Sequence, residues 1–119
     1  MVRTFRDLIV WQKAVQLVTV LYQATKAFPK EELYGLVSQM RRCAVSIPSN
    51  IAEGYGRNST ADYLRFLQVA VGSVYELQTQ LEISKNLAYV HPADYDGLDD
   101  SSREIERMLT SLIKRVRST

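Results

Sequence analysis

The chain has 119 residues, of which 46% are hydrophobic and 24% are charged, and its formal net charge is +2. These values are typical of a single globular domain and exclude a low-complexity chain. The single cysteine, Cys43, excludes an intramolecular disulfide and favours a reducing compartment. Because the sequence shows neither a signal-peptide core nor an apolar run of membrane-spanning length, we expect a cytoplasmic protein with no membrane partner.

The positive charge is concentrated in the first half of the chain. Residues 1–60 carry eight Lys and Arg against four Asp and Glu, whereas residues 61–119 carry seven against nine. An excess of this size weakly indicates an anionic partner, since dedicated nucleic-acid-binding domains are usually more basic.

The first predicted helix spans about residues 7–27, with Asp7 as its N-terminal cap. Apolar residues follow it in two stripes, set roughly 110° apart at 100° per residue. One stripe contains Leu8, Trp11, Val15, Val18 and Tyr22, and the other contains Val10, Ala14, Leu17, Leu21, Ala24 and Phe28. A helix that packs on one core needs a single stripe about 100° wide. The additional stripe therefore predicts self-association.

A second helix is predicted over about residues 31–53, with a kink at Pro48, because proline lacks the N–H that continues the hydrogen-bond ladder. It leads into a corner, residues 46–57, that connects it to the next helix. The corner residues with a predicted structural role are Pro48, Asn50, Glu53, Gly54 and Gly56.

Two interactions are expected within this corner. Gly54 and Gly56 should adopt the left-handed backbone that ends many helices. The Glu53 carboxylate should pair with Arg57 or with backbone amides, which is the common role of a single glutamate beside a helix end.

The third helix is predicted over about residues 59–88, capped by Asn58 or Ser59, and the fourth over about 92–117, with Pro92 in its first turn. Four amphipathic helices with short connections, and no strand-like alternation, predict an all-α fold. The expected architecture is one domain, an antiparallel up-down-up-down four-helix bundle.

No catalytic arrangement emerges from the sequence. The single histidine, His91, excludes a histidine metal cluster, and the acidic residues between Asp94 and Glu106 lack the spacing of a calcium-binding loop. A metal-dependent nuclease around Glu53 would need several converging carboxylates. We therefore predict no catalytic residues, no metal ligands and no cofactor.

Basic side chains are the candidates for binding an anion, because guanidinium groups match the geometry of phosphate. The predicted nucleic-acid-binding residues are Lys13, Arg41, Arg42, Arg57 and Arg65. Three tyrosines, Tyr34, Tyr55 and Tyr63, are placed near them and could stack on bases, although tyrosines at helix ends more often pack within the protein.

Three segments of the chain resemble the bacterial four-helix-bundle family of 23S rRNA intervening-sequence proteins. They are residues 5–14 (FRDLIVWQKA), 46–57 (SIPSNIAEGYGR) and 70–81 (AVGSVYELQTQL). The resemblance covers nearly the whole chain, and its last helix matches least well. By position, Asn50, Glu53 and Arg57 match the corner of the family, where their role is architectural.

The resemblance implies a four-helix bundle that assembles as a ring-shaped homopentamer, in agreement with the two apolar stripes of the first helix. It also implies a relationship to the accessory variability protein of diversity-generating retroelements, which binds its reverse transcriptase and nucleic acid through a basic surface. No enzymatic activity is attached to the family.

Three hypotheses follow for function. The leading one is a non-enzymatic homo-oligomer that binds RNA or DNA through the basic residues of the first two helices and the corner. The alternative is a scaffold that docks a partner protein such as a reverse transcriptase. A metal-dependent nuclease is a distant third.

Overall fold

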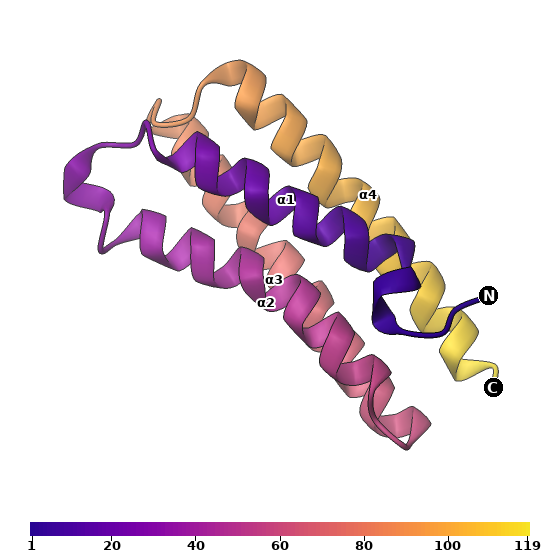
Figure 1. Ribbon diagram of the computed structural model, residues 1–119. Coiled ribbons are helices and arrows are strands. Elements are labelled where there is room, and N and C mark those ends of the chain that lie inside the picture. The colour runs from indigo at the N-terminus through magenta and orange to yellow at the C-terminus, as the bar shows by residue number, and fades with distance from the viewer.

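The computed structural model describes all 119 residues and contains four α-helices and no strand (Figure 1). The helices are α1 (Ile9–Thr25), α2 (Leu36–Tyr55), α3 (Thr60–Asn86) and α4 (Pro92–Arg117), and two short 3-10 turns precede α1 and α2: η1 (Phe5–Asp7) and η2 (Lys30–Glu32). The molecule measures 46 × 24 × 20 Å. The predicted all-α class with four helices is confirmed.

Each helix packs against two of the others, so the four helices enclose a single core. The most extensive helix–helix interface is between α2 and α3, which run in opposite chain directions. The Ser46 hydroxyl lies 2.6 Å from that of Ser73, and the Ser84 hydroxyl lies 3.5 Å from the sulfur of Met40. As the α3 residue number rises, the number of its α2 partner falls.

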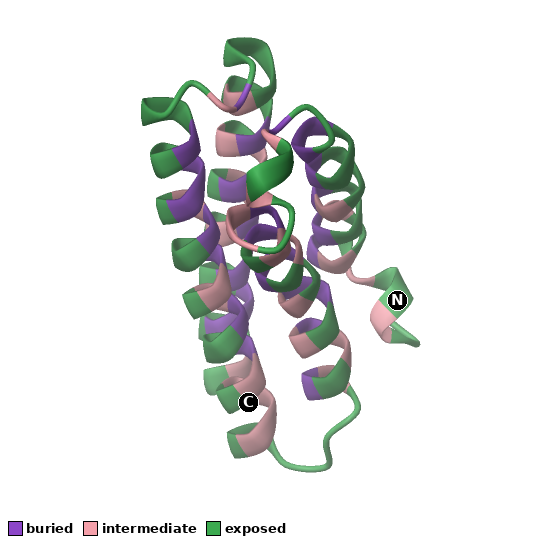
Figure 2. Cartoon of the chain, turned by 90° about the vertical axis from the view of Figure 1, so that its left-hand side faces the viewer, coloured by how far each residue is buried: buried purple, intermediate pink, exposed green.

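The core is built from the inward stripes that the sequence predicts, and Figure 2 shows buried residues along the inner faces of the helices. In α1 and the turn after it, the second predicted stripe is the buried one: Val10, Ala14, Leu17, Leu21, Ala24 and Phe28, all at most 8% exposed. The 3.6-residue period brings these side chains to one face, and their removal from water drives the helices together.

The chain begins differently from the prediction. Asp7 belongs to η1 and not to α1: its carboxylate accepts the backbone N–H groups of Arg3 and Thr4, at 2.8 and 3.1 Å. These two bonds hold the pKa of Asp7 below its ordinary value. The N-cap of α1 is Leu8, which provides no side-chain cap. Asp7 therefore orders the segment before α1 instead of capping it.

The second helix also begins later than predicted. Lys30–Glu32 forms the separate turn η2, and α2 starts at Leu36 after Gly35, whose φ and ψ are −110° and −109°. Glu32 still serves the helix start, because its Oε1 accepts the N–H of Leu36 at 3.2 Å. As a result, Leu33 lies outside the helix and is 47% exposed.

The later boundaries agree more closely with the sequence. The Ser59 hydroxyl accepts the N–H of Asp62 and caps α3, as predicted, and Pro92 occupies the first turn of α4. The cap of α4 is His91, whose Nδ1 accepts the N–H of Ala93 at 3.3 Å. No helix is both long and apolar enough to span a membrane.

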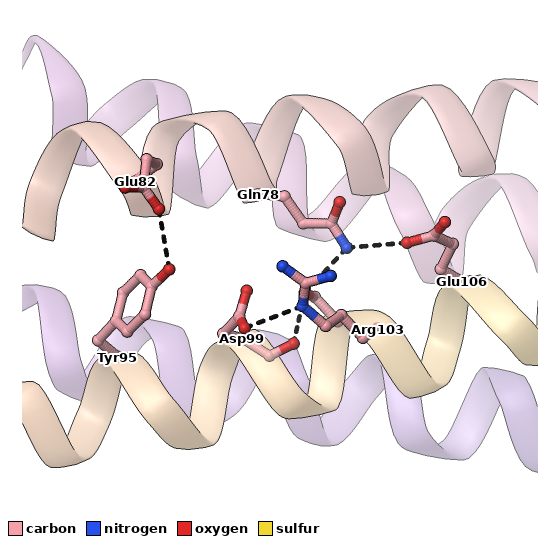
Figure 3. Close-up of polar contacts among 7 residues, drawn as sticks. Gln78, Glu82, Tyr95, Asp99, Arg103 and Glu106 are labelled. Atoms are coloured by element: carbon pink, nitrogen blue, oxygen red, sulfur yellow. Dashed lines mark hydrogen bonds and ion pairs between the residues drawn. The ribbon is translucent and has the colours of Figure 1, made fainter.

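Polar contacts join α3 to the acidic first half of α4 (Figure 3). The Gln78 amide donates to Glu106 at 3.1 Å, and the Tyr95 hydroxyl donates to Glu82 at 3.0 Å. The latter bond, together with burial, raises the pKa of Tyr95. Several α4 carboxylates thus have partners within the bundle, which accounts for part of the acidic run without a calcium ion.

Candidate nucleic-acid interface

Most of the predicted corner, residues 46–57, belongs to one continuous helix. α2 extends through the buried Pro48 to Tyr55, two residues beyond the predicted end. Two side chains bond to carbonyls in this region: Ser46 Oγ donates to the Cys43 carbonyl at 2.6 Å, and Asn50 Nδ2 donates to the Ser46 carbonyl at 2.7 Å. Asn50 therefore bonds back to the preceding turn of α2.

The prediction of a left-handed backbone at the corner glycines is wrong. No glycine has a positive φ, and Gly56 has φ and ψ of −80° and 0°. Gly54 is instead a buried helical residue whose missing side chain admits α3: a Cβ there would lie 2.7 Å from the Cβ of Phe66 and 3.1 Å from Cδ1 of Tyr63. The glycine is required by packing and not by backbone conformation.

The five predicted nucleic-acid-binding residues do not form one surface. Lys13 lies between α1 and α4, where it pairs with Glu104 at 3.2 Å. Arg41 and Arg42 project from the middle of α2, and Arg57 and Arg65 lie at the corner. The structure brings together only the corner pair.

Arg41 is held by the bundle itself. Its guanidinium donates to the Thr25 hydroxyl at 3.0 Å and to the Tyr22 carbonyl at 3.2 Å, and it lies 4.5 Å from the centroid of the Tyr22 ring. These contacts join α2 to the last turns of α1. Arg42, its exposed neighbour, forms no ion pair. Two adjacent arginines thus have different roles, because α2 turns one toward α1 and the other outward.

At the corner, both arginines stack on one aromatic ring. The guanidinium carbons of Arg57 and Arg65 lie 4.6 and 4.8 Å from the centroid of Phe66. Arg65 also forms an exposed ion pair with Asp62 at 3.6 Å, which is a weak interaction in water. The predicted pairing of Glu53 with Arg57 is not found, and Glu53 is exposed without an ion pair.

Two of the three predicted tyrosines belong to the same corner. Tyr55 and Tyr63 meet edge to face, with ring centroids 6.1 Å apart and planes at 90°. Burial raises the pKa of Tyr63, and the nearby charge of Arg115 opposes that shift. The last turns of α4 therefore reach the corner. The third tyrosine, Tyr34, lies elsewhere, in the connection before α2, and is 92% exposed.

Distant parts of the chain add further basic side chains to this end of the molecule. Both Figure 1 and Figure 2 show the C-terminus and the corner at the same end. The N-terminal segment lies beside α4, because Val2 and Leu8 line a hollow of about 470 Å³ with Arg107 and Arg115. We call this region the basic end; it contains Arg3, Arg6, Arg57, Arg65, Arg107, Lys114, Arg115 and Arg117.

Sequence reasoning missed six of these residues, because it considered the basic side chains of the first two helices and the corner and not those of the N-terminal segment or of α4. The acidic side chains in and next to the basic end are fewer: Asp7, Glu53, Asp62, Glu104 and Glu106. Asp7 is bonded to the backbone and Asp62 to Arg65. At the opposite end, Glu31, Glu32, Asp94 and Asp96 are nearly balanced by Lys26, Lys30 and Lys85. The excess of positive charge is therefore local to the basic end.

The remaining chemistry-bearing groups do not form a reaction centre. No three His, Cys, Asp or Glu side chains lie in position to hold a metal ion. The Cys43 sulfur lies 3.0 Å from the Ser73 carbonyl, and burial together with the nearby Glu76 raises the pKa of its thiol to about 12. A thiol with so high a pKa is a poor nucleophile at neutral pH.

Comparison with known proteins places this arrangement in a family. Among solved structures, the chain is similar to a protein of unknown function from the S23 ribosomal protein family of Bacteroides thetaiotaomicron. The two share 26% identity and a TM-score of 0.83 over 92% of this chain and 98% of that one. A search of curated proteins finds no match. The sequence pattern of the 23S rRNA-intervening sequence proteins matches residues 6–111, and the chain belongs to that family.

Proposed function

We propose that this protein is a non-enzymatic, homo-oligomeric helical bundle that binds RNA or DNA through its basic end. The observation that carries the proposal is that Arg57 and Arg65 lie at the same end of the bundle as the basic last turns of α4, beside which the N-terminal segment lies (Figure 1 and Figure 2). Lys and Arg neutralise phosphates and release condensed counterions, which makes such binding strong and salt-dependent. The net charge of +2 underestimates this local field, because the acidic residues accumulate elsewhere.

Self-association is the second part of the proposal. Subunits in the up-down-up-down arrangement would join through the first stripe of α1, in a ring of the kind that the family resemblance implies. On this stripe Val15 and Tyr22 are 37% and 39% exposed, although helix packing normally buries such a row of apolar residues. A ring in which every copy presents its basic end would multiply the phosphate contacts and strengthen binding.

The experiment is fluorescence anisotropy of a labelled structured RNA and a labelled duplex DNA, titrated with protein from low to physiological salt. We expect the affinity to fall linearly on a log–log plot against salt. Replacing Arg115 and Arg117 together by Ala should lower the slope by about two, because each lost phosphate contact changes it by about one.

A matched control separates local from global charge effects. Lys26 and Lys30 lie at the opposite end, and their joint replacement by Ala changes the net charge by the same amount. We expect this variant to retain the affinity and salt slope of the unaltered protein. Equal effects of both double variants, or no binding at low salt, would overturn the proposal.

A second candidate is the protein scaffold that docks a partner such as a reverse transcriptase. It is favoured by one observation: Tyr34 and Leu33 protrude beside a hollow of about 370 Å³ that Arg41 and Arg42 also line. Tyrosine and arginine dominate the energetics of protein interfaces. Flat anisotropy curves together with a partner retained in high salt would favour this candidate. A metal-dependent nuclease ranks third, and no cluster of side chains supports it.

A further inference from the structure

Aromatic rings lie among the cations of the corner, as Phe5 does beside Arg6 in the N-terminal segment. Tyr55, Tyr63 and Phe66 are each half-buried and keep part of their surface in contact with solvent. The two tyrosines meet edge to face, and the guanidinium groups of Arg57 and Arg65 lie over the Phe66 ring. Near Lys114, Arg115 and Arg117 of α4, by contrast, the sequence supplies no aromatic residue of its own. The corner therefore offers both charges and stacking surfaces.

The packing of the corner fixes these rings in place. The backbone of Gly54 lies directly against the side chains of Phe66 and Tyr63. Tyr55, on the following residue of α2, is held by the edge of Tyr63. A ring that is already ordered loses little conformational entropy when a second flat group stacks on it.

The two corner arginines are available for a ligand. Arg57 is exposed and forms no ion pair, and the partner of Arg65 is a carboxylate 3.6 Å away that is itself 51% exposed. An interaction of this kind is easily replaced by a phosphate. Because Phe66 and Tyr63 both lie against Gly54, the two guanidinium groups at Phe66 are close to the tyrosines.

A site that combines cationic side chains with exposed aromatic rings distinguishes single strands from duplexes. In a duplex the faces of the bases are stacked on one another and are closed to a protein ring, whereas an unpaired base has a free face. Positive grooves with aromatic platforms are the common solution for binding single strands, with little dependence on sequence.

We propose that the corner formed by Tyr55, Arg57, Tyr63, Arg65 and Phe66 binds unpaired nucleotides, with bases on the tyrosines and phosphates on the arginines. This inference rests on the proposed function and adds its substrate class: single-stranded RNA or DNA, or the unpaired regions of a folded RNA. The arginine-rich end of α4 supplies the part of the affinity that does not depend on bases.

The test compares three labelled probes of equal length by anisotropy at one salt concentration: an unstructured single-stranded RNA, an abasic single strand and a duplex. We expect the base-bearing single strand to bind about 5- to 100-fold more tightly than the abasic strand, which keeps the phosphates and lacks the stacking groups. We also expect the duplex to bind more weakly per phosphate than the single strand.

Tyr55→Leu removes the proposed stacking ring and keeps an apolar side chain at the corner. It should weaken binding of the base-bearing strand by about 5- to 100-fold and leave the abasic strand unchanged. Tyr55→Phe, which retains the ring, should bind like the unaltered protein. Tyr34→Leu is the matched control, because Tyr34 is exposed but distant from the corner. Thermal unfolding of each variant verifies that the bundle is intact.

The two proposals fail in different ways. If all three probes bind equally and Tyr55→Leu has no effect, the corner does not read unpaired bases, while phosphate binding by the basic end stands. If none of the probes binds at low salt, the proposed function fails first, and the inference fails with it.

Discussion

Ala88 adopts a backbone conformation that its side chain disfavours. Its φ is 59°, the only positive value at a residue other than glycine, and the neighbouring Tyr89 N–H donates to the Ser84 carbonyl at 2.9 Å. This geometry ends α3 in the way that glycine usually does, and a Cβ makes it costly.

Ala88→Gly should therefore raise the free energy of unfolding by about 1 kcal/mol, because glycine adopts the left-handed region without a steric penalty. Urea denaturation followed by circular dichroism measures the change. Ala93→Gly, in the first turn of α4, is the control and should lower stability by up to about 1 kcal/mol, since Ala93 is helical. A loss of stability in Ala88→Gly would contradict this account of the turn.

Arg41 and Arg42 show how much of a residue's role lies beyond its local sequence. They are identical and adjacent, and the sequence assigns both to nucleic-acid binding. In the structure Arg41 is held by Thr25 and Tyr22, whereas Arg42 is exposed. The difference comes from a 100° rotation per residue relative to a neighbouring helix that the local sequence does not place.

At the scale of the elements, the contact between α2 and α3 depends on Gly54. Its Cα faces Phe66 and Tyr63 so closely that an added methyl group would force the helices apart. The side chains of Ser46 and Ser73, about two turns away along both helices, lie 2.6 Å from each other and mark the same close approach. Small residues thus set the spacing of this helix pair.

We expect Gly54→Ala to lower the free energy of unfolding by about 1–3 kcal/mol, because overpacking outweighs the better helix propensity of alanine. The measurement is a shift of the urea midpoint. The matched substitution is Gly72→Ala, also within a helix of this pair, where an added Cβ meets nothing within 4 Å. That variant should gain about 0.5–1 kcal/mol. Equal stability of the two variants would rule out a packing role for Gly54.

The helices themselves followed from the sequence to within a few residues at most ends. The periods of the apolar residues in α3 and α4 identify their buried faces, and Pro92 and Ser59 mark their starts. The errors are at Asp7 and at the start of α2. In both places a short 3-10 turn competes with the α-helix, and the competition is decided by one or two backbone hydrogen bonds.

At the scale of the whole molecule, the apolar stripe of α1 that the bundle does not bury is the basis for self-association. Trp11 and Val18 on this stripe are half-buried at the edge of the core, and Val15 and Tyr22 remain exposed. On α2, Val45 is 39% exposed as well. Apolar side chains that contact water in a row of this kind are unfavourable in an isolated subunit.

Light scattering at micromolar concentration should therefore give a mass several times 13.6 kDa. Val15→Glu places a charge on the stripe and should shift the protein toward the monomer. Val20→Glu is the matched control, because Val20 is 46% exposed but lies outside the stripe, and it should leave the assembly intact. A monomeric unaltered protein, or equal dissociation of both variants, would refute the interface.

The sequence by itself determined the four helices and the family, because these depend on periodicity and on short, specific segments. Only the tertiary structure decided which charges stand together. Arg3, Arg57 and Arg115 are far apart in sequence, and the sequence places its basic excess in the first half of the chain. Folding places the corner and the C-terminus at the same end and the N-terminal segment beside α4 (Figure 1 and Figure 2), since helix packing, and not chain order, determines which helix ends become neighbours.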